Sequence, residues 1–138
     1  MFDHCLYFNT AALARRLDRE WTTAFKPFGL TAPQGFLLRA VLASPGQLLS
    51  ALAETLGISR PTATRAVDAL ELRGLVKRSG CDGDGRQTAV WPTAEAEALG
   101  GQLEQASAAV TRRLKAQLGE SSFVDTVARV RGVRNALE

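Results

Sequence analysis

Hydrophobic positions recur with a helical period along most of the chain and predict six helices and two strands. Between Leu6 and Phe28 the apolar residues stand three, four or seven apart, which predicts one long helix with a single apolar stripe. Thr31 and Gln34 form a capping box that opens a second helix. A short third helix is predicted over residues 48–56.

The second helix is expected to turn four residues toward the core: Phe36, Leu37, Ala40 and Val41.

The fourth helix begins with a polar turn. Gly57 is typical of the position that ends a helix, Ser59 is an N-cap, and Pro61 lies in the first turn, where a missing N–H costs little. The face expected to be buried carries Ala63, Ala66, Val67 and Leu70. The side chains expected to face outward are Arg60, Thr64, Arg65 and Asp68. Two helices joined by a short turn, the second opening with polar residues, indicate a helix-turn-helix.

After Gly74 the helical period gives way to two extended runs. Residues 75–79 and 86–91 predict strands, and three glycines between residues 80 and 85 predict the turn that joins them. A hairpin directly after the second helix of a helix-turn-helix is typical of a wing. The alternative is a surface hairpin held by exposed salt bridges and without a function.

Two more helices complete the chain, so that the order is α-α-α-α-β-β-α-α, a mainly α winged helix-turn-helix in a single domain over 1–138. Thr93 caps the first of the two. The last carries apolar positions at near-heptad spacing: Phe123, Val127, Val130, Val133 or Arg134, and Leu137. The apolar stripes of the terminal helices exceed what a small central motif can cover. We therefore expect 1–28 and 93–138 to be dimerisation helices, and 31–92 to be the winged helix-turn-helix.

Composition limits the function classes. The 138 residues are 46% hydrophobic and 22% charged, which fits one globular domain, and a net charge of +3 permits a polyanionic partner. No apolar run approaches the ~20 residues of a membrane span, and no signal peptide precedes the first helix, so we expect a cytoplasmic protein that does not enter a membrane. A single histidine, without metal-ligand spacing, a phosphate loop or a nucleophile–base pair, argues against an enzyme, a metal site and a cofactor.

Four runs in a fixed order carry the most specific pattern. They are Leu30-Thr31-x-x-Gln34, Ala51-Leu52-Ala53-x-x-Leu56-Gly57-Ile58-Ser59, Thr62-x-Thr64-Arg65-x-Val67-Asp68-x-Leu70-Glu71-x-Arg73-Gly74-Leu75-Val76-x-Arg78, and Asp84-x-Arg86. Together they resemble the MarR family of winged-helix transcription regulators over nearly the whole chain. The resemblance implies a homodimer that binds pseudo-palindromic double-stranded DNA, mostly as a repressor. The chain departs from the family pattern at Pro92-Thr93, where Leu-Thr is usual, and lacks the glycine that follows three residues later.

The fourth helix is expected to enter the major groove with its N-terminal end. Pro61, Thr62 and Arg65 are placed to approach base edges. Phosphate contacts are expected from the first-turn N–H groups and from Ser59, Arg60 and Thr64. The competing interpretation is an ordinary solvated helix end.

In the wing, Arg86 is expected to enter the minor groove, while Lys77 and Arg78 meet phosphates. Asp84 is expected to order the wing by pairing with Arg86 or Arg78.

Cys5 is a candidate redox sensor. The segment around it is similar to the peroxide-sensing branch of the family, and a helix N-terminus beside His4 could lower the pKa of the thiol. That branch uses tyrosines from the partner's second helix, whereas this chain has only Tyr7. The alternative is a small hydrophobe buried in the dimer seam. Cys81, in the wing turn, is interpreted as an incidental surface thiol.

Many members of the family instead bind small aromatic acids between the dimer base and the winged helix. The aromatic residues that could line such a pocket, or simply fill the core, are Trp21, Phe25, Phe28 and Phe36. The functional expectation is a sequence-specific DNA-binding regulator, a repressor released by a small-molecule inducer or an oxidant. The alternative is a winged-helix protein-interaction module without sequence-specific DNA binding.

Overall fold

The computed structural model describes residues 1–80 and 88–138 and confirms a mainly helical winged-helix fold. The elements, in chain order, are α1 (Leu6–Phe25), the 3-10 helix η1 (Lys26–Phe28), α2 (Ala32–Ala43), β1 (Gln47–Leu48), α3 (Leu49–Leu56), α4 (Arg60–Leu72), β2 (Val76–Gly80), β3 (Thr88–Pro92), α5 (Ala94–Leu118) and α6 (Glu120–Ala136).

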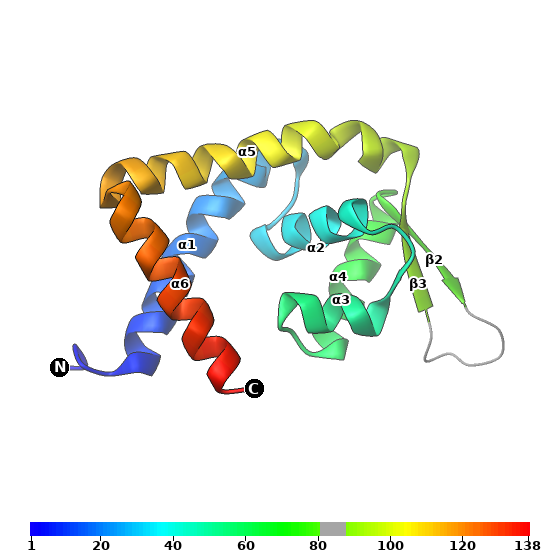
Figure 1. Cartoon of the computed structure of the whole chain (residues 1–138). Coiled ribbons are helices and arrows are strands. Elements are labelled where there is room, and N and C mark those ends of the chain that lie inside the picture. The colour runs from blue at the N-terminus through cyan, green and yellow to red at the C-terminus, as the bar shows by residue number, and fades with distance from the viewer. Residues whose placement is uncertain (81–87) are drawn as a thin grey trace.

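The long helix α5 runs along one side of the molecule and connects its two ends (Figure 1). At one end α6 folds back from α5, and α1 packs against α5 beside it. At the other end α2, α3 and α4 pack together next to the three-stranded sheet. The two chain ends lie far from the sheet (Figure 1).

Local capping residues begin the helices where the sequence predicts. Thr31 and Gln34 form both bonds of the capping box, and the hydroxyls of Ser59 and Thr93 accept from backbone N–H groups three residues on. The first helix is shorter than predicted, because it ends at Phe25 and continues as the 3-10 turn that contains Pro27. Proline has no N–H for the next α-helical bond, so the chain tightens instead.

The sheet has one strand that the sequence pattern did not predict. Gln47 and Leu48 form β1 and pair antiparallel with Val90 and Ala89 of β3, which gives the strand order β1-β3-β2. Two residues are too short to show an alternating pattern. The predicted turn residues Cys81, Asp84 and Arg86 lie outside the described residues.

The core lies between α2, α3, α4, α5 and the sheet. In α4, Ala63, Val67 and Leu70 are fully buried, as predicted. The prediction for Phe36 was wrong, because this ring remains 38% exposed while the Leu38 side chain is fully buried. Gly35 explains how α2 approaches α1 so closely, since a Cβ at this position would overlap the Phe25 ring.

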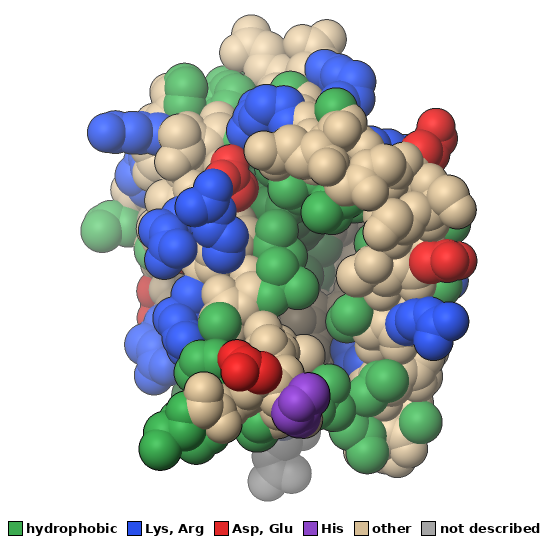
Figure 2. All heavy atoms as spheres, turned by 90° about the vertical axis from the view of Figure 1, so that its left-hand side faces the viewer, with side chains coloured by type: hydrophobic (Ala, Val, Ile, Leu, Met, Phe, Trp, Pro, Cys, Tyr) green, Lys and Arg blue, Asp and Glu red, His purple; other side chains and the backbone are tan. Residues whose placement is uncertain are grey.

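The helices at the chain ends leave apolar surface uncovered in the single chain. No residue of α6 is buried, and large apolar side chains are exposed on α1 and α6: Leu6, Leu13, Val124, Val127, Val130, Val133 and Leu137. A groove of about 560 Å³ lies between α1, α5 and α6. Figure 2 shows this end of the molecule, hollowed at its centre and lined by hydrophobic side chains, with Lys and Arg side chains gathered to one side. None of the helices in the described ranges is long and apolar enough to cross a membrane.

Candidate nucleic-acid interface

The N-terminal end of α4 presents an ordered polar edge. Ser59, Pro61, Thr62 and Arg65 are all exposed, and Arg60 between them is exposed too. Ser59 Oγ accepts from the Thr62 N–H at 3.2 Å and donates to Thr62 Oγ1 at 2.8 Å. Arg65 Nη2 also donates to Thr62 Oγ1, at 3.4 Å. These contacts hold hydroxyl and guanidinium groups side by side on the surface before any partner arrives.

Thr62 is the centre of this edge. Its Oγ1 accepts from both Ser59 and Arg65. Within the described residues, the Thr62 hydroxyl can therefore still donate its proton to a partner at the surface. Thr64 was expected to face outward but is half-buried, because it stands three residues before the buried Val67 and so lies at the edge of the buried face. The exposed part of the edge is therefore narrower than the sequence suggested.

Arg78 does not present the free cation that a phosphate contact requires. Its Nη2 lies 2.6 Å from Asp68 Oδ1 and 2.9 Å from Glu71 Oε1, so two carboxylates of α4 neutralise it. The hydrogen bond from Arg78 holds the pKa of Glu71 below its ordinary value, and the same bond raises the pKa of Arg78. The predicted phosphate role of Arg78 is replaced by a structural one, since the contact ties β2 to α4.

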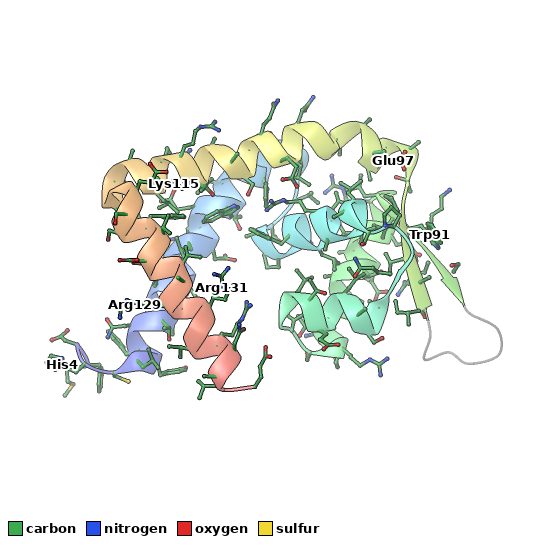
Figure 3. The ribbon with its side chains drawn as sticks, in the orientation of Figure 1. His4, Trp91, Glu97, Lys115, Arg129 and Arg131 are labelled. Atoms are coloured by element: carbon green, nitrogen blue, oxygen red, sulfur yellow. The ribbon has the colours of Figure 1, made fainter. Side chains whose placement is uncertain are left out.

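The outer face of the wing carries Lys77 and Trp91. Lys77 is exposed and is paired in register with Trp91 of β3. Trp91 lies at the sheet end of the molecule (Figure 3), and its Nε1 donates to Ser79 Oγ at 3.1 Å. Lys77 and Arg78 are the predicted wing contacts that lie in the described residues. Of the two, Lys77 is the exposed one.

Arg73 is a residue whose role sequence reasoning missed. Its Nη1 donates to the Gly29 carbonyl at 2.6 Å and its Nη2 donates to the Phe28 carbonyl at 2.9 Å. These bonds join the C-terminal end of α4 to the corner between η1 and α2. Arg73 therefore fixes how α4 sits relative to α1, although the Arg-Gly pair at the helix end was its only signal in the sequence.

A second groove, of about 480 Å³, separates α1 and α2 from the turn between α3 and α4. Trp21 and Phe36 line this groove, and their role as ligand-binding residues stays a prediction. Phe25 does not line the groove: this ring is fully buried and packs edge-on against Phe36 with the centroids 6.1 Å apart, which fits the alternative that it fills the core. Phe28 is half-buried and packs against the hydrophobic core, so two of the four aromatic residues are core residues.

Cys5 is the N-cap of α1. Its Sγ accepts from the Phe8 N–H at 3.5 Å, and the residue is exposed in the single chain. Tyr7, two residues away, is 80% exposed. In the described part of the chain, no group of three or more His, Cys, Asp or Glu residues is placed to hold a metal ion.

Comparison with known proteins assigns the central motif. The family model for MarR proteins matches residues 28–87, which contain α2, α3, α4 and the start of the wing. The similarity to the MarR family therefore lies in the winged helix. The HTH-type transcriptional regulator YybA of Bacillus subtilis is 35% identical over 66 residues, and that match spans 48% of this chain and 44% of YybA. The chain thus spans less than half the length of that relative.

Solved structures resemble the chain over almost its full length. The transcriptional repressor CouR bound to a 23-mer DNA duplex is 25% identical with a TM-score of 0.85, and 96% of this chain covers 94% of that one. The PcaV transcriptional regulator of Streptomyces coelicolor, in complex with its natural ligand, is 25% identical with a TM-score of 0.81, and 100% of this chain covers 97% of that one. The similarity therefore includes the terminal helices that the family model does not reach.

Proposed function

We propose that this chain is a sequence-specific transcription regulator that binds double-stranded DNA as a repressor. The observation that carries the proposal is α4, which buries Ala63, Val67 and Leu70 and exposes a hydrogen-bonded edge around Thr62 and Arg65. A helix that served only the core would not order polar side chains at its free end. Arg65 suits guanine and the Thr62 hydroxyl suits several bases, while the first-turn N–H groups suit a phosphate.

The regulator acts as a homodimer on a pseudo-palindromic site. The groove between α1, α5 and α6 and the exposed apolar stripe of α6 support this, because a monomer would leave both in water. Two copies of α4 about one DNA turn apart, ~34 Å, would then enter successive major grooves. The likeness to CouR bound to a DNA duplex agrees with such an arrangement.

Release from DNA is brought about by a small molecule in the groove of Trp21 and Phe36. This groove touches Ile58, which directly precedes the N-cap of α4, so an occupant alters the start of the reading helix. The likeness to PcaV in complex with its natural ligand supports a ligand-controlled regulator. An oxidant acting on the exposed Cys5 is the alternative inducer.

The second candidate function is a winged-helix protein-interaction module. The observation that favours it is the neutralisation of Arg78 by Asp68 and Glu71, which leaves the surface beside α4 less basic than the sequence suggests.

Fluorescence anisotropy with DNA from the promoter region beside the gene distinguishes the two functions. We expect Arg65→Ala to lose about 5- to 150-fold in affinity, as for a base-contacting arginine worth about 1–3 kcal/mol. Arg129→Ala is the matched control, because Arg129 points from α6 away from the winged helix (Figure 3). Equal affinity of the Arg65→Ala variant and the wild type would favour the interaction module, and a monomer in sedimentation at micromolar concentration would contradict the dimer.

Peroxide and Cys5→Ser test the alternative inducer. Loss of DNA binding with cumene hydroperoxide that persists in the Cys5→Ser variant would exclude Cys5 as the sensor.

A further inference from the structure

The charge in the groove of Trp21 and Phe36 is negative. Asp18 is the charged residue that lines it among the described residues, and it lies on the exposed side of α1. The Asp18 carboxylate forms no ion pair or hydrogen bond within residues 1–80 and 88–138. The Asp18 carboxylate would therefore repel a negatively charged ligand at the mouth of this groove and attract a positively charged one.

Arg39 stands beside the groove and already has an acidic partner. Its Nε and Nη2 donate to the two carboxylate oxygens of Glu104 at 2.7 and 3.0 Å, and its Nη1 donates to Ser107 Oγ at 3.0 Å. The bidentate pair occupies one edge of the guanidinium and offsets its charge. Binding a carboxylate ligand there would first require breaking the contact with Glu104.

Two aromatic rings form the walls near Asp18, and contacts outside the groove hold both. The centroids of Trp21 and Phe36 lie 6.0 Å apart with 56° between the ring planes. Trp21 Nε1 donates to the buried Ser107 Oγ at 3.0 Å, and the Arg39 guanidinium lies 4.9 Å from the centre of the Phe36 ring. Since these rings are already oriented, a ligand would lose little entropy in ordering them.

Two fixed aromatic rings and a carboxylate are the groups that recognise an organic cation. Ring faces attract positive charge, most strongly where water is excluded, and the carboxylate supplies the opposite charge. The remaining walls are apolar and include Leu17, Leu56 and Ile58, and about 480 Å³ suits a small organic molecule. We propose that this groove binds a lipophilic aromatic cation, selected by Asp18 together with the rings of Trp21 and Phe36.

The inference rests on the proposed function only in taking the occupant as the inducer. Binding itself can be measured without DNA, so the two can fail separately. An aromatic cation that binds a chain without DNA affinity would leave the inference standing and contradict the proposed function.

A pair of ions of the same shape and opposite charge tests the selectivity. We expect isothermal titration calorimetry to show tetraphenylphosphonium binding the wild-type chain at least about tenfold more tightly than tetraphenylborate. Asp18→Asn should weaken tetraphenylphosphonium about three- to tenfold. Asp125→Asn is the matched control, because it removes the same charge from an exposed position on α6 and should leave the affinity unchanged.

Three results would overturn the proposal. They are the absence of tetraphenylphosphonium binding to the wild-type chain, equal or tighter binding of tetraphenylborate, and an equal effect of Asp18→Asn and Asp125→Asn. The comparison of the two ions needs no variant, so it remains decisive even if a substitution disturbs folding.

Discussion

Replacing Arg73 by methionine should loosen the attachment of α4 to the corner between η1 and α2. The change removes two hydrogen bonds from a charged donor, to the Gly29 carbonyl at 2.6 Å and to the Phe28 carbonyl at 2.9 Å. Methionine keeps an apolar stem of similar length, so the packing along the side chain is largely retained. What is lost is the polar contact between elements far apart in the sequence.

The expected loss follows from the exposure of this contact. Hydrogen bonds to charged groups contribute about 1.5–3 kcal/mol each to stability. Arg73 is exposed, so water replaces part of each bond in the variant, and we expect about 1–2 kcal/mol less free energy of unfolding for the pair.

Gly29 provides a second variant that isolates the contact. Gly29 has φ of 68°, and a Cβ there would lie 2.9 Å from Arg73 Nη1. Gly29→Ala should therefore cost about 1–2 kcal/mol of backbone strain and, in addition, the crowding against the guanidinium. In the Arg73→Met background the crowding disappears, so Gly29→Ala should cost less there than in the wild-type chain.

Urea unfolding measures the wild type, the two single variants and the double variant of this cycle. All four are compared at the same chain concentration, because the stability of a dimer depends on concentration. A loss below about 0.5 kcal/mol for Arg73→Met would show that water satisfies the two carbonyls equally well. Additive losses in the double variant would refute the predicted crowding between the Gly29 position and the guanidinium.

Three further predictions concern packing, capping and pH. Gly35→Ala should lower the free energy of unfolding in urea, because overlap with Phe25 costs about 1–3 kcal/mol and the gain in helix propensity is about 1 kcal/mol. Ser59→Ala should cost about 1 kcal/mol in the same assay, since it removes the N-cap of α4. Hydrogen bonds from Arg39 hold the pKa of Glu104 below its ordinary value, so the stability they contribute is present above that value and is lost as pH falls through the lower folded-state pKa. Thermal unfolding across the acid range should therefore depend less on pH in the Glu104→Gln variant.

Control variants separate these specific effects from a general loss of stability. Gly101→Ala is the control for Gly35→Ala, because a Cβ at Gly101 meets nothing within 4 Å and should stabilise α5 by up to about 1 kcal/mol. Equal behaviour of the two alanine variants would contradict the close packing at Gly35. An acid dependence that is unchanged in Glu104→Gln would mean that the pair with Arg39 adds nothing to stability.

Residues close together along the chain set the features that could be predicted from the sequence. Thr31, Ser59 and Thr93 begin their helices where predicted, because an N-cap bonds to an N–H only a few residues away. The buried face of α4 was predictable for a related reason, since the 3.6-residue period places Ala63 and Val67 on one side. Local chemistry was therefore enough for the order of the helices and for the exposed edge of α4.

The partner that each side chain contacts depends on the tertiary structure. Arg78 and Arg73 both read as basic residues near a DNA-binding helix, yet one pairs with Asp68 and Glu71 and the other bonds to carbonyls 44 and 45 residues away. Among the aromatic residues, Phe25 is buried in the core, while Phe36 lines a groove. Periodicity specifies the face of a helix but not the element that covers it, and hydrogen bonding and burial depend on that neighbour.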